Sequence, residues 1–348
     1  MAYYIDGFPG RKIKIHGKNY LYFGGTSYLG LQTDKNFQDL FINNIRKYGT
    51  NYGASRKSNV RISVYGKAET LLANIVGSDA ALTMSSGYLA GQFIAQNFNK
   101  PGYKLFYAPN THSALYNNYN KPYPDFKTLN LAITEHLGLK DDIVPVLFLD
   151  SIDFNGYNYP EFKELANLPL DKIILIVDDS HGIGIIGKNG EGVFRTLQKF
   201  NAKELIICCS LGKGYGIQGG AVLGSNERVK QLSGTAFFGG ASPAAPSGMA
   251  TFIEAQSIYA SKRSQLYRNM AYFEQSIDQI DFFHHLNGHP TYTFSSPEMA
   301  DYIEKKGFIL TNFKYPAESS SVMSRVVLGS HHSLKDIEGL CKCINAFL

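Results

Sequence analysis

The sequence lacks tryptophan, and its 348 residues include only four cysteines. Cys208 and Cys209 are adjacent in an apolar run, and Cys341 and Cys343 form a C-x-C near the C-terminus. A zinc site needs four nitrogen or sulfur ligands at characteristic spacings, and no C-x-x-C or matching histidine pair is present. We therefore expect buried structural thiols and no metal site.

Charged residues are also scarce. They make up 18% of the chain, against roughly 25% in an average soluble domain, and 34 basic and 29 acidic residues leave a net charge of +5. No basic run exceeds two residues, so the sequence does not predict nucleic-acid binding. Few charges together with 23 tyrosines and 23 phenylalanines favour a large buried interface.

No hydrophobic run is long enough to cross a membrane. The strongest one, at residues 173–177, is far shorter than the about 20 residues that a spanning helix needs. Residues 1–10 lack the basic and apolar stretches of a secretory signal. The composition is not that of a disordered chain, which combines low hydrophobicity with high net charge. We expect a folded cytoplasmic protein without a membrane partner.

Apolar runs alternate with helical patterns over the first two thirds of the chain. Strands are predicted at residues 80–84, 104–107, 144–149, 172–177 and 205–209. Helices are predicted at residues 37–48, 66–76, 87–98 and 111–119. Near-continuous apolar strands are typical of parallel sheets whose two faces are covered by helices. The pattern predicts an α/β fold with a large, mostly parallel sheet.

The two ends of the chain have a different pattern. Residues 12–16 and 20–23 predict a hairpin with its turn at 17–19. A long helix is predicted at 247–280, followed by short strands and a last helix at 333–347. We therefore predict three parts, which are an N-terminal segment (1–35), a large domain (36–246) and a smaller C-terminal α+β domain (247–348).

Polar clusters directly follow four of the predicted strands, at residues 85–88, 110–113, 178–182 and 210–216. Ligands of doubly wound sheets bind at the carboxyl ends of the strands. The central cluster contains Lys213 between Gly212 and Gly214, where the backbone can bend closely around a bound group. A partly desolvated lysine amine can form a Schiff base with a carbonyl cofactor. The alternative interpretation is a surface lysine in a glycine-rich loop.

Two other motifs overlap this cluster. Gly214-x-Gly216-x-x-Gly219 matches a dinucleotide fingerprint, but a strand follows where that motif requires a helix. Ser210-x-x-Lys213 matches a serine β-lactamase motif, but its S-D-N and K-T-G partners are absent. Neither motif has the context it needs.

The neighbouring clusters supply complementary chemistry. Asp178 closes an apolar strand, where a cationic ring nitrogen would compensate its carboxylate, although Asp178 and His181 could also form only a turn cap and a packed ring. Ser86 begins a helix whose N–H groups suit a phosphate or form an ordinary N-cap. His112 by itself is ambiguous. With Lys213, these residues form the set that pyridoxal phosphate (PLP) requires.

From about Tyr20 onward the sequence resembles the α-oxoamine synthase family of fold-type-I PLP enzymes. The ordered motifs that carry the resemblance are Tyr28-Leu29-Gly30-Leu31, Gly53-Ala54-Ser55-Arg56, Ser85-Ser86-Gly87-Tyr88, Thr111-His112-Ser113, Asp178-Asp179-Ser180-His181-Gly182-Ile183-Gly184 and Ser210-Leu211-Gly212-Lys213-Gly214-Tyr215-Gly216. The resemblance implies a large PLP-binding domain, a smaller C-terminal domain and a homodimer with shared active sites.

The resemblance also implies a role for each matching residue. Lys213 would bind the cofactor covalently, Asp178 would pair with the ring nitrogen, and His181 would contact the ring hydroxyl. His112 would stack on the ring and Arg325 would bind the substrate carboxylate. The residues along the phosphate would be Ser86, Gly87, Tyr88 and Ser210.

Two positions depart from the family pattern. Thr26, at the substrate side, stands where the family usually has asparagine. Gly239-Gly240 stands where the family usually has two threonines that reach the phosphate of the neighbouring subunit. Any contact from these glycines would have to use backbone N–H groups. The residues expected to act on the second substrate therefore differ from the family pattern more than the residues expected to bind the cofactor do.

Three functions are compatible with these residues. The first is condensation of a small amino acid with an acyl-CoA or acyl-carrier thioester, with Lys213 as base and His112 as a proton donor. The second is a PLP-dependent aminotransferase of class I/II or another amino-acid-transforming PLP enzyme. The third is a cofactor-binding protein without turnover. Thiol release distinguishes the first, and keto-acid formation the second.

Overall fold

The computed structural model describes residues 2–116, 121–139, 142–154, 156, 158–315 and 320–348. The chain forms two compact units. One unit combines the segment that ends at Asp39 with Gln256–Leu348, and the other is Leu40–Ala255. The expected boundaries after residues 35 and 246 lie close to these positions but do not coincide with them.

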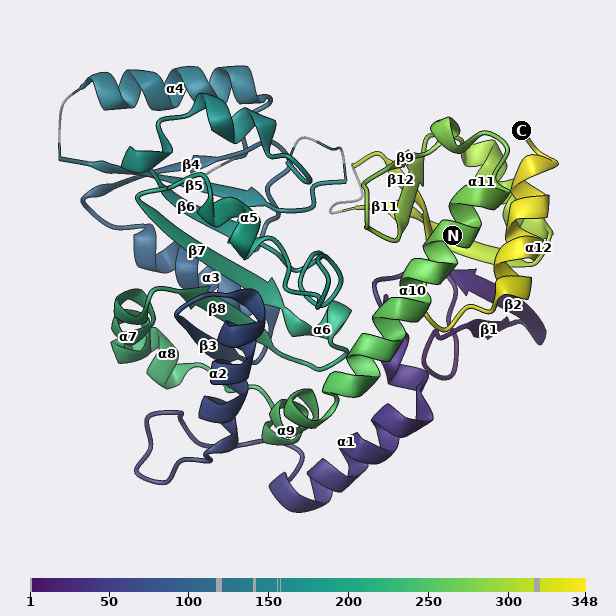
Figure 1. The fold of residues 1–348 in the computed structure, drawn as a ribbon, viewed down its shortest axis with the longest axis horizontal. Coiled ribbons are helices and arrows are strands. Elements are labelled where there is room, and N and C mark those ends of the chain that lie inside the picture. Colours follow the sequence, from purple (N-terminus) through teal and green to yellow (C-terminus); the bar gives the residue numbers. More distant parts are fainter. Residues whose placement is uncertain (1, 117–120, 140–141, 155, 157, 316–319) are drawn as a thin grey trace. The chain divides into compact units, whose positions relative to one another are not determined.

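The Leu40–Ala255 unit is built on a six-stranded sheet (Figure 1). Its strands are β3 (Ala80–Met84), β4 (Tyr103–Tyr107), β5 (Val144–Asp150), β6 (Ile174–Asp178), β7 (Glu204–Ser210) and β8 (Gly220–Gly224), in the order β3-β8-β7-β6-β5-β4. Strands β4 to β7 are parallel, and β8 is antiparallel to both of its neighbours. This confirms the predicted α/β fold with a mostly parallel sheet.

Helices cover this sheet. Helix α3 (Gly87–Phe98) packs against β3, β7 and β8, while α4 (Phe126–Gly138) packs against β4 and β5. Alternate residues of the strands enter one core cluster with α3, including Phe148, Ile176 and Cys208. All five residues of β6 are buried. Strand β6 is therefore apolar up to its final Asp178, because neither of its faces meets water.

The remaining helices of this unit surround the sheet's β3 edge or join its strands. They are α2 (Val64–Val76), α5 (Phe194–Gln198), α6 (Leu211–Gly214), α7 (Asn226–Gly234), α8 (Ala236–Gly240) and α9 (Pro246–Glu254). Helix α1 (Lys35–Tyr48) begins before the unit boundary, and its Asn44 donates hydrogen bonds to Thr251 (3.3 Å) and Glu254 (3.1 Å) of α9.

The other unit contains a second six-stranded sheet, in the order β1-β2-β11-β12-β10-β9. Its strands are β1 (Lys12–Ile15), β2 (Lys18–Phe23), β9 (His284–His285), β10 (Thr291–Phe294), β11 (Phe308–Lys314) and β12 (Val322–Val327), and its helices are α10 (Gln256–Ser276), α11 (Pro297–Lys305) and α12 (Leu334–Asn345). The N-terminal hairpin therefore extends the C-terminal sheet through a parallel pairing of β2 with β11. Arg11, just before the hairpin, also forms an ion pair with Asp336 of α12 through two guanidinium–carboxylate contacts (2.6 and 2.8 Å).

Three predicted elements differ from the structure. The hairpin turn is His16–Gly17, because both residues have the positive φ that a two-residue turn demands. The predicted helix at 247–280 is two helices interrupted at Ala255, where ψ is 12°. No glycine or proline marks this break, so the sequence pattern continues across it. No helix forms at residues 111–116, and residues 117–120 lie outside the described part.

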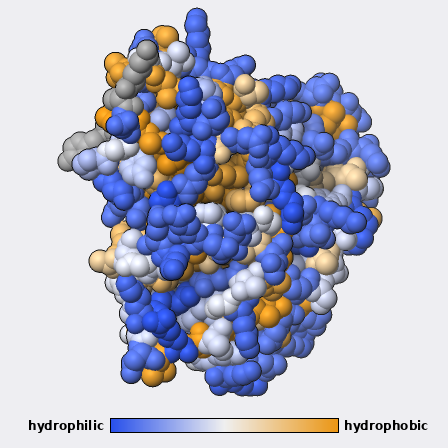
Figure 2. Space-filling view, turned by 60° about the vertical axis from the view of Figure 1, so that its left-hand side comes forward, coloured by the Kyte–Doolittle hydropathy of each residue, from blue (hydrophilic) through white to orange (hydrophobic). Residues whose placement is uncertain are grey.

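None of the helices in the described ranges is long and apolar enough to cross a membrane. On the face shown in Figure 2, hydrophilic side chains predominate and hydrophobic ones form scattered groups. The large hydrophobic side chains that are exposed include Val60, Leu131, Leu139 and Phe313.

Candidate active site

The candidate site lies at the carboxyl ends of the parallel strands, as predicted. Strand β6 ends at Asp178 and β7 ends at Ser210, which is also the N-cap of α6. Strand β5 ends at Asp150, directly opposite Asp178 in the strand register. The acidic, basic and hydroxyl groups of different strands are thereby brought to one edge of the sheet.

Lys213 lies in α6, a single helical turn that follows β7. Its Nζ is 2.9 Å from Nε2 of His181. Gly214 allows this approach, because a Cβ atom there would lie only 2.2 Å from the carbonyl oxygen of Ile183. The lysine turn is thus packed directly against the turn that carries His181, and two of the predicted catalytic residues are in contact.

The Asp178 carboxylate is buried and accepts a hydrogen bond from the backbone N–H of Ser180 (2.8 Å). The Ser180 hydroxyl in turn accepts one from the backbone N–H of Ser210 (2.8 Å). These two bonds join the ends of β6 and β7, so the position of Asp178 is coupled to the turn that carries Lys213.

His112 lies in the loop after β4. Its backbone N–H donates to Oδ2 of Asp150 (3.0 Å), and its Nδ1 accepts from the N–H of Ala114 (3.2 Å). Burial lowers the pKa of His112, and Lys213 lowers it further, while Asp178 opposes this shift. The ring is therefore neutral near pH 7, and since Nδ1 is an acceptor its proton is on Nε2.

The N-terminus of α3 faces the start of α6. Ser86 caps α3 by accepting a hydrogen bond from the N–H of Leu89 (3.1 Å). A Cβ atom at Gly87 would lie 2.6 Å from Cβ of Ser210, so only glycine permits this approach. Two helix starts and two hydroxyl groups therefore meet here, a favourable environment for a phosphate. The adjacent Tyr88 is 57% exposed.

The residues at this edge fit PLP. The amine of Lys213 and the buried carboxylate of Asp178 both act electrostatically on the neutral imidazole of His112. The close approach of Gly87 and Ser210 leaves N–H groups and hydroxyls at the α3 end of the same edge. These groups match the parts of PLP in turn. The amine suits the aldehyde, the carboxylate suits the cationic ring nitrogen, the imidazole suits the ring face, and the N–H groups and hydroxyls suit the phosphate.

Asp179 faces away from this chemistry although it is adjacent to Asp178. Its carboxylate accepts hydrogen bonds from the Ser151 hydroxyl (2.6 Å) and the backbone N–H of Val193 (3.1 Å). Burial raises the pKa of Asp179 to about 7, and these two hydrogen bonds oppose the shift. Asp179 therefore anchors the turn that follows β6.

The two predicted substrate residues belong to the other unit. Thr26 is exposed, shortly after β2. Arg325 lies on β12, where it is paired with Thr293 of β10 and Thr311 of β11. Arg325 is therefore on a central strand of this sheet, with a neighbouring strand on each side. Burial lowers the pKa of Arg325 to about 10, and the nearby Tyr28 opposes this shift.

Gly239 and Gly240 form the end of helix α8. The N–H of Gly239 donates to Thr235 within that helix, and its carbonyl oxygen accepts from the Ser55 hydroxyl (2.6 Å). The sequence predicts that any contact of these glycines with a neighbouring subunit would use backbone N–H groups. At Gly239 that N–H is already bonded within the helix.

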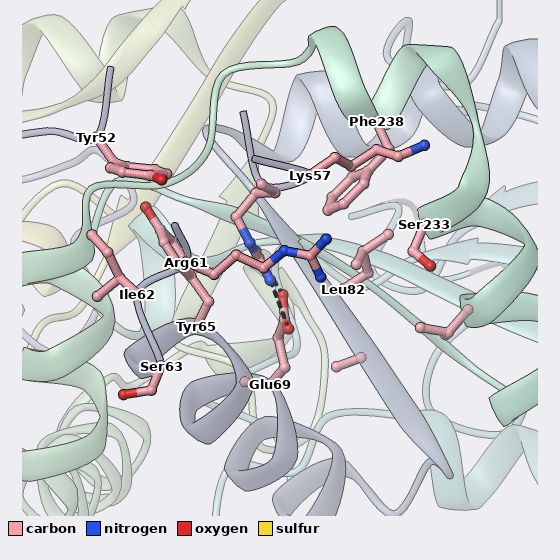
Figure 3. Close-up of a pocket in the computed structure, with 14 residues that line it drawn as sticks. Tyr52, Lys57, Arg61, Ile62, Ser63, Tyr65, Glu69, Leu82, Ser233 and Phe238 are labelled. Carbon is pink, nitrogen blue, oxygen red and sulfur yellow. Dashed lines mark hydrogen bonds and ion pairs between the residues drawn. The ribbon is translucent and has the colours of Figure 1, made fainter. Parts of the chain in front are cut away.

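A cavity of about 510 Å³ lies between α2, β3, α7 and α8 (Figure 3). An ion pair between Arg56 and Glu69 crosses it, with contacts of 2.9 and 3.0 Å. Glu69 also accepts the N–H (2.7 Å) and hydroxyl (2.8 Å) of Thr83, and the Arg56 guanidinium lies over the Tyr65 ring. The residues that line this cavity include none of the predicted cofactor residues.

Three residues of this site have no role in the predictions made from the sequence. Asp150 and Ser151 lie outside the predicted polar clusters, and Ser180 lies within one of them. Asp150 has the same signature as Asp178, an acid that closes an apolar strand. That signal was available in the sequence. The hydrogen bonds of Ser151 and Ser180 link different strand ends, so no local pattern identifies them.

Comparison with known proteins supports the same assignment. The 8-amino-7-oxononanoate synthase of Aliivibrio fischeri is 26% identical, covering 95% of this chain and 90% of the relative. A serine palmitoyltransferase from S. paucimobilis, solved with a bound PLP–myriocin adduct, has a TM-score of 0.82 and 18% identity, covering 99% of this chain and 92% of that one. The 8-amino-7-oxononanoate synthase of Francisella tularensis has a TM-score of 0.69 and 21% identity, covering 94% and 97%.

The two solved structures confirm the fold predicted from the motifs. The curated relative, which spans nearly the whole chain, confirms the resemblance to α-oxoamine synthases. The family model described as aminotransferase class I and II matches residues 156–344, more than half of the sequence. The chain therefore belongs to the aminotransferase class I and II family.

Proposed function

We propose that this protein is a PLP-dependent acyltransferase that condenses a small amino acid with an acyl thioester. The observation that carries the proposal is the meeting of Lys213, His181, Asp178 and His112 at one sheet edge beside the start of α3. Curated relatives named 8-amino-7-oxononanoate synthase and the structural similarity to serine palmitoyltransferase support this reaction class.

When bound, PLP supplies an aldehyde for the amino group and a ring that withdraws electrons from the amino-acid α-carbon. Asp178 would keep the ring nitrogen protonated, and His112 would cover the ring face. Lys213 Nζ, which contacts His181, would be the base that accepts the α-proton. The neutral His112 has a proton on Nε2 that it can donate to a developing oxygen.

The overall reaction forms one carbon–carbon bond between the α-carbon of the amino acid and the acyl carbonyl carbon. The thioester carbon–sulfur bond breaks, and the sulfur leaves as a thiol after it takes a proton. In a decarboxylating version the amino-acid carboxylate leaves as carbon dioxide. No oxidant or reductant is needed. Arg325, a partly buried guanidinium, is the proposed ligand of the substrate carboxylate.

The experiment is an assay of purified protein with PLP, a panel of small amino acids and acyl-CoA thioesters of several chain lengths. We expect free CoA to appear only when amino acid and thioester are both present. An amino acid that shifts the absorbance of the bound cofactor identifies the amino donor before the acyl partner is known. Cofactor binding without CoA release from any pair would count against acyl transfer.

Transamination is the second candidate, because the family model that matches this chain is that of the class I and II aminotransferases. Both reactions begin with the same cofactor and the same lysine. Formation of a keto acid from the amino acid alone, without any thioester, would favour transamination.

We further propose a homodimer whose two sites are each completed by the partner chain. The proposal rests on the low charged fraction, the many aromatic residues and the exposed hydrophobic side chains. Light scattering at micromolar concentration should give about twice the 38.6 kDa chain mass. A monomer that binds PLP and turns over would contradict this proposal.

A further inference from the structure

Asp150 stands between the two parts of the site that would contact the cofactor ring. Its strand β5 lies between β6, which ends at Asp178, and β4, which leads to His112. Oδ2 of Asp150 accepts a hydrogen bond from the backbone N–H of His112 (3.0 Å). In the pairing of β5 with β6, Asp150 is the register partner of Asp178. One side chain is therefore adjacent to both the predicted ring-stacking residue and the predicted ring-nitrogen partner.

Asp150 is a second carboxyl group in a space that already contains one. Its Oδ1 is buried and has no hydrogen-bond partner among the residues that the structure describes. A buried, ionised oxygen without a partner is costly, and two adjacent carboxylates disfavour each other's charge. By contrast, the Asp178 carboxylate has a backbone N–H donor and the proposed cationic ring nitrogen to stabilise it. The arrangement favours a proton on Asp150.

We propose that Asp150 is a positioning residue of this site, which holds the backbone of His112 as an uncharged carboxylic acid and leaves Asp178 as the only negative charge of the pair. This inference rests on the proposed function, because His112 and Asp178 gain their roles from PLP. It adds a residue that neither the motifs nor the resemblance identified.

The electrostatic surroundings agree with this assignment. Burial, followed by the Asp178 carboxylate, raises the pKa of Asp150 well above its usual range, while Lys213 and the His112 N–H oppose the shift. Asp150 interacts electrostatically or by a hydrogen bond with the following titratable and charged residues: Asp178, Lys213, His112, Asp153, Tyr116 and Cys208. Lys213 is the only cation in this set, and it also contacts His181.

Infrared spectroscopy tests the proton directly. The full chain should show the C=O stretching band of a protonated carboxylic acid near neutral pH, and Asp150→Asn should remove it. The comparison is made in an Asp179→Asn background, because Asp179 has a pKa of about 7 and would add a band of its own. A spectrum that loses no such band on Asp150→Asn would show an ionised Asp150 and overturn the proposal.

Cofactor binding tests the positioning role. Asp150→Asn retains an acceptor for the His112 N–H, so PLP affinity should stay within about twofold and the absorbance maximum of bound PLP should not move. Asp150→Ala leaves that N–H without its acceptor and should weaken PLP binding about tenfold, with a shifted absorbance. Asp171→Asn, which changes an exposed aspartate of the same unit, is the control and should resemble the wild type.

Two outcomes would overturn the positioning role. One is an Asp150→Ala protein that binds PLP with wild-type affinity and absorbance, and the other is an Asp150→Asn protein as impaired as Asp150→Ala. A wild-type chain that binds no PLP would instead remove the proposed function, and the infrared band would still report on the proton.

Discussion

Nζ of Lys213 lies 2.9 Å from Nε2 of His181, across two turns that are 32 residues apart in the sequence. The contact depends on the close packing of Gly214 against Ile183. It identifies Lys213 as the amine at the centre of the strand-end cluster.

Lys213→Ala should abolish covalent attachment of PLP. Borohydride fixes a cofactor–lysine bond, and peptide mapping of the reduced protein then identifies the labelled lysine. We expect the label on Lys213 in the wild type and none in the variant. Lys188→Ala, which changes an exposed lysine in the same unit, should keep the label. Label on another lysine would refute the site assignment.

Asp178→Asn should retain PLP but lose turnover, on the order of 100-fold, because a neutral partner cannot keep the ring nitrogen protonated. Steady-state rates and the cofactor-to-protein ratio are the measurements. Asp179→Asn should reduce the rate much less, since Asp179 bonds to Ser151 and Val193 and faces away from the lysine turn. Equal losses would mean that the two carboxylates act together.

Asp179 should make the free energy of unfolding fall as pH rises. Burial raises its pKa to about 7 in the folded chain, so between about pH 4 and pH 7 the folded state binds more protons than the unfolded state. The effect is at most about 1.4 kcal/mol per pH unit. Its stabilising contribution is fully present below pH 4 and is lost as pH passes 7.

Urea unfolding at pH 5 and pH 8 measures this effect. The stability of the wild type relative to Asp179→Asn should be greater at pH 5 than at pH 8. The exposed Asp171→Asn variant should keep the pH dependence of the wild type. An Asp179→Asn protein with unchanged pH dependence would contradict the buried, high-pKa state.

The Arg56–Glu69 pair should be worth far more to stability than an exposed pair. Both side chains are only 12–13% exposed, and Glu69 also binds Thr83. Arg56→Met or Glu69→Gln should each lower the free energy of unfolding by about 3 kcal/mol or more, because each leaves a buried group without its partner. The double variant should lose less than the sum of the two.

The exposed Lys35–Asp39 pair of helix α1 provides the matched control for this cycle. Its two residues are one helical turn apart, and solvent screens their interaction. Additive losses at Arg56 and Glu69, like those expected at Lys35 and Asp39, would show that the buried pair is not coupled.

Much of the fold could be predicted from the sequence because its signals are local. Apolar runs such as residues 172–177 and 205–209 mark buried strands wherever they occur, and the polar clusters after them mark strand ends. Lys213, Asp178, His181 and Ser86 were identified in this way. The structure places all four at the same edge of one sheet.

Other features depend on contacts between distant segments. The loop at 111–116 is not helical because Thr111 bonds to the carbonyl oxygens of Ala108 and Phe148, and the N–H of His112 bonds to Asp150. The pattern of residues 12–23 predicts only an isolated hairpin, yet these residues complete a sheet with strands almost 300 residues later.

Which segments are strands and which chemical groups follow them can be predicted from the sequence alone, because side-chain periodicity and residue type are properties of a few neighbouring residues. The position of Asp150 opposite Asp178, the place of Arg325 on a central strand and the burial of Asp179 with Ser151 are instead consequences of tertiary packing. Strand register and burial arise from hydrogen bonds and packing between segments far apart in the chain, and no local pattern contains them.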